Sequence, residues 1–255
     1  MSLRLLFSLL FFTAQSAFAQ SETPNVVDDQ GQKQGLWSAK HSNGKLRYKG
    51  EFKDNEPVGL FTYFDVHGNL NAEINNRGDS ADVTFFHLNK KMMAEGKYYQ
   101  QQRSGVWKFY DIEEDISSQK YYVKGKENGP ARVYYKDGRI SRDCSYRNGV
   151  KHGQLTDYFP EGKTKFEAVF VDGNPDGKIK HFHTSGGVKI IGYYKIAVQE
   201  GTWTYFAPDG KVERYEVYRN GFLKKSFTPE EAKKMKEDQK KIDSTKTPAP
   251  GIKEQ

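Results

Sequence analysis

The fold is decided by a stretch that recurs along the chain and reads Gly201-Thr202-Trp203-Thr204-Tyr205-Phe206-Ala207-Pro208-Asp209-Gly210-Lys211-Val212, continuing through Tyr218 to Asn220-Gly221. Aligning its leading glycine gives eight copies, which begin at Gly35, Gly59, Ala81, Gly105, Gly129, Gly153, Gly177 and Gly201. The spacing is 24 residues except for one step of 22. A fixed period of this length is typical of repeat arrays, whose units pack on their neighbours.

Each copy has the pattern of one β-hairpin. Apolar or aromatic residues stand two and five positions after the leading residue, often with a threonine between them, as in a strand. A glycine such as Gly44, Gly138 or Gly210 follows and supplies the positive φ of a tight turn. A second strand leads to an Asn-Gly or Asp-Gly turn. The sequence therefore predicts an all-β, elongated and twisted antiparallel meander of about eight 24-residue hairpins.

The third copy departs from this pattern. Ala81 replaces its leading glycine and Lys90 replaces its turn glycine, and the approach through residues 75–78 is shortened. We expect a bulge or kink there. The fourth copy also lacks the turn glycine, with Glu114 in its place.

Two columns of the alignment describe the packing. Trp37, Trp107 and Trp203 share one column and predict a buried ring in their copies, with the greatest loss on truncation at Trp107 because it has neighbours on both sides. The only cysteine, Cys144, indicates a site for a small side chain because of the residues that share its column: Gly50, Gly96, Ala168 and Gly192. A single cysteine cannot form an internal disulfide.

The two ends of the chain differ from the array. Residues 1–19 combine Arg4, an apolar run and Ala17-Phe18-Ala19, which predicts a secretory signal peptide cleaved after Ala19 and a periplasmic or extracellular protein. The apolar run is too short to span a bilayer. Residues 20–34 form a lead-in, 35–221 the array, 222–242 a strand end and a short capping helix that begins near Thr228, and 243–255 a disordered tail.

Charge and residue chemistry argue against several functions. Of the formal charge of +7, Arg4 carries one unit and the segment after Gly221 carries three, so the array is near +3 and has no basic stripe. Nucleic acid is therefore not an expected partner. An array spreads side chains along a surface, whereas an active site needs them to converge, so we expect neither an enzyme nor a cofactor. Cys144 with His152, or Glu113 with Glu114, would reopen the question if a pocket lay beside them.

Histidines also invite a metal interpretation. His181 and His183 alternate on one strand, and a column of the array holds His41, His87 and His183 together with Asp65 and Asp111. Equivalent residues of successive hairpins lie about 10 Å apart, too far to share one ion. No metal site is predicted.

The repeating Gly-x-Trp-x-x-Tyr/Phe pattern, followed by Asn-Gly-Lys-Leu, a tyrosine and Asn-Gly, resembles the MORN repeat family in its bacterial variant form. The resemblance covers Gly35 to Gly221. It implies a scaffold that binds proteins or lipid surfaces, and similar bacterial proteins are labelled antitoxins.

We therefore expect an exported, non-enzymatic scaffold that binds a protein partner or an envelope component through an aromatic face. The proposed binding row is the uninterrupted central part of one column of rings, Tyr110, Tyr134, Tyr158 and Phe182. Alternation places it on the face opposite Trp107. The rings would either bind or brace the sheet by stacking. A carbohydrate-binding or carbohydrate-processing envelope protein and an antitoxin-like protein are the alternatives, and a homo-oligomer stays open.

Overall fold

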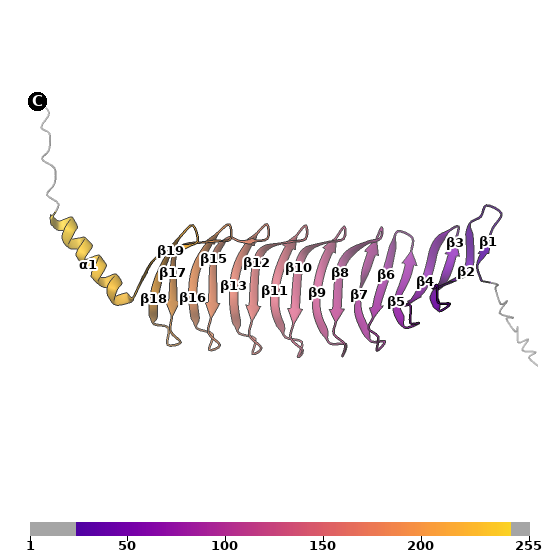
Figure 1. Ribbon diagram of the computed structural model, residues 1–255, viewed down its shortest axis with the longest axis horizontal. Coiled ribbons are helices and arrows are strands. Elements are labelled where there is room, and N and C mark those ends of the chain that lie inside the picture. The colour runs from indigo at the N-terminus through magenta and orange to yellow at the C-terminus, as the bar shows by residue number, and fades with distance from the viewer. Residues whose placement is uncertain (1–23, 246–255) are drawn as a thin grey trace, which may run out of the picture.

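The computed structural model describes residues 24–245, which form one antiparallel meander and one helix (Figure 1). The elements are β1 (Val26–Val27), β2 (Lys33–Lys40), β3 (Leu46–Lys53), β4 (Glu56–Phe64), β5 (Leu70–Arg77), β6 (Ser80–Phe86), β7 (Met92–Tyr99), β8 (Gln102–Tyr110), β9 (Ile116–Val123), β10 (Lys126–Tyr134), β11 (Ile140–Arg147), β12 (Val150–Tyr158), β13 (Thr164–Val171), β14 (Asn174–Pro175), β15 (Gly177–Phe182), β16 (Val188–Lys195), β17 (Val198–Phe206), β18 (Val212–Arg219), β19 (Phe222–Phe227) and α1 (Pro229–Thr245).

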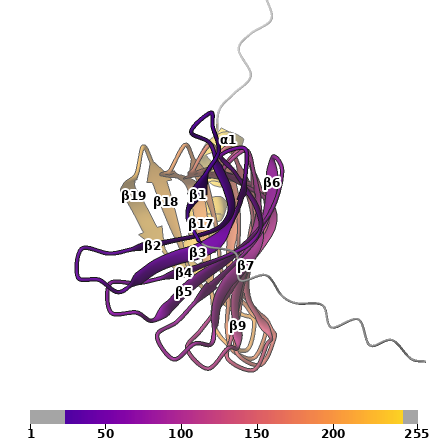
Figure 2. The same ribbon diagram turned by 90° about the vertical axis from the view of Figure 1, so that its right-hand side faces the viewer.

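The sheet is long, open and twisted. Each strand pairs with the next one along the chain, and β14 and β15 together pair with β13. Figure 1 shows the strands side by side along the long axis, and the end-on view shows their direction turning from the first copies to the last (Figure 2). The predicted all-β meander is therefore confirmed. The predicted signal peptide and its cleavage site lie outside the described residues.

The two long edges of the sheet carry different turns. At one edge a longer turn joins the two strands of each copy, and its glycine has positive φ, as in Gly44, Gly138 and Gly210. Lys90 and Glu114, which replace that glycine, adopt the same conformation with φ of 67° and 77°. At the other edge a two-residue turn such as Asn148-Gly149 leads to the next copy. The turn signals in the sequence are thus confirmed at both edges.

The core is a single layer of side chains on one face, which we call the core face. It contains Trp107, Phe61, Ile179 and the other fully buried apolar residues. Rings of a neighbouring strand meet them edge-on, as Tyr98 of β7 meets Trp107 of β8 at 5.3 Å between centroids. Such edge contacts stabilise a layer that has no second sheet to cover it.

Where two copies meet, a small residue of one copy and a large residue of the next fill the core layer together. A Cβ added to Gly96 would lie 2.3 Å from the Trp107 ring, and one added to Gly50 would lie 2.5 Å from Phe61. Cys144 stands in the same column, is buried, and pairs with Leu155. The prediction of a small-residue site at Cys144 is confirmed, because the next copy's large side chain lies over it.

The prediction of a bulge at the start of the third copy is wrong. Most other copies have a bulge at this position and the third copy has none. Between most copies the pairing jumps, as from Glu95↔Lys108 to Lys97↔Ser104, so that two extra residues bulge out beside a leading glycine such as Gly105. Between β5 and β6 the pairing runs without a jump. The step of 22 residues is therefore a regular pair of strands, and the period of 24 includes the bulge.

The ends of the array are built differently. Trp37 is only half-buried, because β1 covers little more than its indole edge, where Nε1 donates to the carbonyl of Val26 at 3.2 Å. Its predicted burial is therefore incomplete. At the other end, Thr228 and Glu231 form a reciprocal capping box that starts α1, as predicted. The helix ends at Thr245, and Figure 1 shows it leading away from the sheet instead of lying across the last hairpin.

Candidate functional site

The predicted binding row lies on the face opposite the core face, which we call the row face. The Tyr110 hydroxyl donates to Glu95 Oε1 at 2.8 Å, and Lys108 Nζ lies 2.9 Å from the same oxygen. These side chains alternate with Trp107 along their strands, so Tyr110 is on the predicted face. Tyr134, Tyr158 and Phe182 occupy the same position in the following copies, and all four rings are half-buried.

The row does not hold the sheet together by stacking. Among the described residues, the ring pairs involve core-face side chains such as Trp107 with Phe109, the terminal pair Tyr215 with Phe227, and the pair Phe166 with His181. None of them joins two members of the row. Their copies are two strands apart, which is about 10 Å. The bracing alternative therefore lacks its expected contact, and the rings stay available from one side.

Ion pairs cross the row face at one repeated position. Lys108 with Glu95, Arg132 with Asp143 and Lys180 with Glu167 each join adjacent strands at 2.9 to 3.1 Å. Hydrogen bonds from Lys108 and then Tyr110 lower the pKa of Glu95, whereas burial and the bond to Glu95 raise the pKa of Tyr110 to about 12. The pairs are largely exposed, so each contributes little to stability, but they order the polar side chains of this face.

Open hollows lie on the same face in the first half of the array. One of about 590 Å³ extends from Leu36 to Leu60, and another of about 500 Å³ extends from Leu60 to Val106. All three of these apolar side chains are exposed, Leu60 by 55%. They sit between the charged positions along the sheet. The row face thus offers shallow apolar depressions with polar surroundings, which suit a partner surface better than a small substrate.

The histidine column has a structural role in the described residues. His41 Nε2 lies 3.0 Å from the carbonyl oxygen of Phe64, and His183 Nε2 lies 2.9 Å from that of Phe206. His87 makes the same contact to Tyr110 at 3.2 Å, and the hydroxyl of Tyr135 replaces the histidine in the fifth copy. Each ring therefore ties a long turn to the next copy. Sequence reasoning missed this role, because the carbonyl partner is 23 residues away.

The remaining candidates, in the described part of the chain, each contact a different partner. Cys144 donates weakly to the Ala131 carbonyl at 3.5 Å, and burial raises the pKa of its thiol, which disfavours the thiolate. His152 instead lies 3.5 Å from Asp172 at the edge of the sheet. Glu114 accepts a hydrogen bond from the Met92 amide, which ties the turn that contains Glu114 to the start of β7. Within residues 24–245 no three metal-ligating side chains gather.

Comparison with known proteins supports the repeat interpretation at two positions. The model of the MORN repeat variant family matches residues 33–54 and 199–220, which are the first and the last copies. No curated protein matches the sequence. Between residues 24 and 245, the structure has no helix that combines the length and hydropathy needed to cross a membrane.

Similarities to solved structures are distant. A TarM crystal structure aligns with 38% of this chain at 14% identity and a TM-score of 0.28. An S. aureus TarM mutant in complex with Fondaparinux, alpha-GlcNAc-glycerol and UDP aligns with 46% at 12% identity and a TM-score of 0.30. TcdB2-TccC3 aligns with 78% at 10% identity and a TM-score of 0.20. The alignments cover 20%, 21% and 13% of those chains.

Proposed function

We propose that this chain is an exported, non-enzymatic repeat scaffold that binds a protein partner through the row face. The observation that carries the proposal is the gathering on one face of half-buried rings, exposed apolar side chains and ordered charges. Tyr110 to Phe182 form the ring row, and Leu36, Leu60 and Val106 adjoin the open hollows. Protein interfaces combine aromatic and aliphatic contacts with a polar surround in this way.

The array supports binding over a long surface. Each copy adds an equivalent set of side chains about 10 Å further along the sheet, so a partner can touch several copies at once. Contacts repeated in this way raise the overall affinity without any deep pocket. Export is proposed from residues 1–19, whose apolar run and small residues before Gln20 have the pattern of a signal peptide.

The test begins with a chain of residues 20–255 as bait for envelope proteins, followed by affinity measurement with the purified partner. Replacing Tyr134 and Tyr158 together with Ser removes the centre of the row. We expect the melting temperature to stay within a few degrees and the affinity to fall at least tenfold. The matched control replaces Tyr99 and Phe222, exposed rings at the opposite edge of the sheet. It should keep the affinity.

Other outcomes would contradict the proposal. Equal affinity in the Tyr134 and Tyr158 double variant would exclude the row as the binding surface. A captured glycan, released by free oligosaccharide, would support the carbohydrate alternative. A captured toxic enzyme whose activity the chain suppresses would support the antitoxin-like alternative. A signal peptide retained on the secreted or periplasmic protein would contradict cleavage after Ala19.

A further inference from the structure

One ring is missing from the core face. Seven copies place an aromatic residue near the end of their second strand, namely Phe52, Tyr98, Tyr122, Tyr146, Phe170, Tyr194 and Tyr218. The second copy has Asn76 at this position. Its side chain is tied back to the protein, because Nδ2 donates to the carbonyl of Gly59 at 3.2 Å. The amide therefore does not replace the ring that the other copies provide.

The rings of this column have a common geometry. Phe52 meets Phe61 edge-on at 5.1 Å, and Tyr194 meets Trp203 edge-on at 5.4 Å between centroids. In each case the ring packs on the large core residue of the next copy. The place that Asn76 leaves lies beside Ala81, which packs against the cluster that contains Trp107. An aromatic ring placed there would complete the series.

The pairing of the strands enlarges this gap. Tyr98 pairs with Arg103, whose guanidinium lies 4.6 Å from the Trp107 ring centroid and covers it. Asn76 pairs with Ala81, because the third copy lacks the bulge that would bring a longer side chain opposite. Two short residues therefore face each other where other copies have a ring beside a longer side chain.

A hollow of about 370 Å³ opens at this point on the core face. Its walls include Pro57, Ile74, Ala81 and Tyr98, and Ile74, Ala81 and Tyr98 also pack against the Trp107 cluster. The floor therefore continues the apolar layer of the array. It is open to solvent on one side, next to the two-residue turns.

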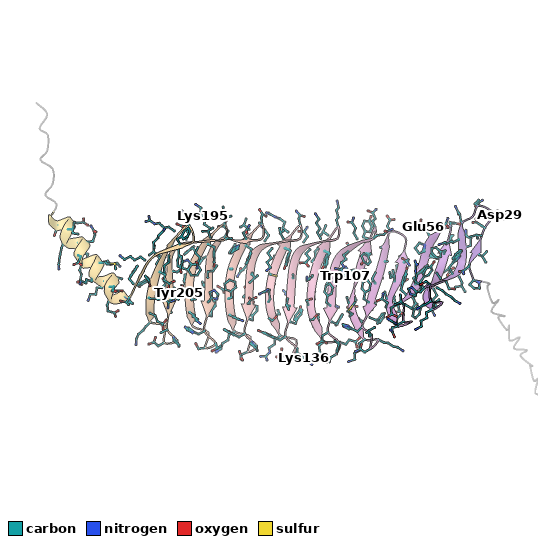
Figure 3. All side chains as sticks on the ribbon, in the orientation of Figure 1. Asp29, Glu56, Trp107, Lys136, Lys195 and Tyr205 are labelled. Atoms are coloured by element: carbon teal, nitrogen blue, oxygen red, sulfur yellow. The ribbon has the colours of Figure 1, made fainter. Side chains whose placement is uncertain are left out.

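The rim of the hollow is acidic. Glu56 and Asp79 both line it and both are exposed, and none of the residues that line it is a lysine or an arginine. Figure 3 shows Glu56 at the edge of the sheet that carries the two-residue turns. A ligand that places a ring between these walls would have its neighbouring groups beside two carboxylates. Positive charge next to the ring is therefore favoured.

We propose that this hollow binds one aromatic side chain of a protein partner, a Phe or Tyr with a Lys or Arg beside it. The ring takes the place that the chain's own ring holds in seven other copies, with its edge toward the core layer and Tyr98 at its side. The basic neighbour pairs with Glu56 or Asp79. The hollow is on the core face, so this site is independent of binding by the row face.

The test uses short peptides as probes of the full chain of residues 20–255. Acetyl-Lys-Phe-Lys-amide carries the proposed ring and charges, acetyl-Lys-Leu-Lys-amide lacks the ring, and acetyl-Glu-Phe-Glu-amide reverses the charge. Binding is measured from NMR shifts of the Tyr98 ring, which lines the hollow. We expect the first peptide to bind at least fivefold more tightly than either of the others.

Two substitutions that place the same ring on opposite faces of one strand provide the control. Asn76→Tyr supplies the missing ring, so it should raise the melting temperature. It should also lower the affinity for the Lys-Phe-Lys peptide at least tenfold. Asn75→Tyr puts the same ring on the adjacent residue, which lines a hollow of the row face. It should leave peptide binding unchanged. Ala81→Leu narrows the hollow from the other strand and should also lower the affinity for this peptide. It keeps the test valid if Asn76→Tyr does not fold.

Three results would overturn the proposal. The first is equal binding of the Phe and Leu peptides. The second is unchanged peptide affinity in both Asn76→Tyr and Ala81→Leu. The third is binding of maltotriose at the Tyr98 ring in preference to the Lys-Phe-Lys peptide, which would assign the hollow to a sugar. Loss of partner binding in the Tyr134 and Tyr158 double variant, with peptide binding retained, would separate this site from the row face.

Discussion

The third and fourth copies of the array make the same hairpin with different cores. In the fourth copy Trp107 lies over Gly96, and Gly105 sits in a two-residue bulge. In the third copy Val83 faces Ile74 and the strands pair without a bulge. Both core residues are buried. The difference shows that the total side-chain volume stays similar where two copies meet, because a large and a small residue fill the space as well as two medium ones do.

The comparison also separates the two edges of the sheet. At the long-turn edge the third copy is ordinary, because His87 contacts the Tyr110 carbonyl as His41 contacts that of Phe64. At the two-residue-turn edge, the junction between the second and third copies has neither the bulge nor the ring found at most other junctions. A repeat can therefore change at one edge while the other keeps its geometry.

The largest effect is expected when the large core residue of a single copy is truncated. Trp107→Ala should lower the free energy of unfolding by about 3 to 5 kcal/mol, as for other large buried rings. Val83→Ala removes only two methyl-sized groups and should cost roughly 2 kcal/mol. Trp37→Ala should cost less than Trp107→Ala, because Trp37 is half-buried. Urea unfolding of the three variants gives the order, and equal losses at Trp37 and Trp107 would contradict it.

The second effect tests the shared volume directly. Gly96→Ala places a methyl group against the Trp107 ring and should cost about 1 to 3 kcal/mol through overpacking. Combining it with Trp107→Leu recreates the small and medium pair seen at Cys144 and Leu155. The double variant should therefore lose less than the sum of the single ones. Additive losses in a double-mutant cycle would show that the two residues do not share one space.

A smaller effect concerns the turns that lack glycine. Lys90 has φ of 67°, a left-handed conformation that costs roughly 1 to 2 kcal/mol for a residue with a Cβ. Lys90→Gly removes this strain but adds freedom to the unfolded chain, so a gain of about 0.5 to 1 kcal/mol is expected. The reverse change at Gly138, which has φ of 82°, should lose a similar amount. Thermal unfolding of both variants measures this, and no gain at Lys90 would contradict the strain.

The smallest effect depends on pH and distinguishes the fourth copy from the third, which has Phe86 at the position of Tyr110. Burial, and then the bond to Glu95, raise the pKa of Tyr110 from 10 to about 12. A pKa that is higher in the folded than in the unfolded chain stabilises the fold at pH values below the unfolded pKa. This contribution is therefore complete below pH 10 and is lost as the pH approaches 12. Tyr110→Phe should weaken the dependence of stability on pH in this range.

Ultraviolet titration of the phenolate provides the direct measurement for Tyr110. Comparison of the wild type with Tyr110→Phe isolates its transition from those of the other tyrosines. Glu95→Gln should bring the transition closer to pH 10, because the neutral amide no longer favours the protonated hydroxyl. A Tyr110 transition at pH 10 in the wild type would exclude the hydrogen bond to Glu95.

Much of the candidate surface followed from alternation alone. Tyr110 lies opposite Trp107, as a period of two residues requires. The hollows beside Leu36, Leu60 and Val106 were not predicted, because their depth depends on how far neighbouring strands curve apart. The role of the histidine column was also missed. Its signal was present as a recurrence every 24 residues, but its partner is a carbonyl group, which every residue has.

The sequence by itself determined the number of hairpins, the places of the turns and the faces of the strands. These follow from local backbone preferences, such as positive φ at Gly44, and from side-chain alternation within one strand. Only the tertiary structure decided that the period of 24 contains a bulge, that Gly96 lies beneath Trp107, and that Asn76 leaves a gap. Those features depend on the register between strands of successive copies, which is set by packing and pairing together and not by either strand alone.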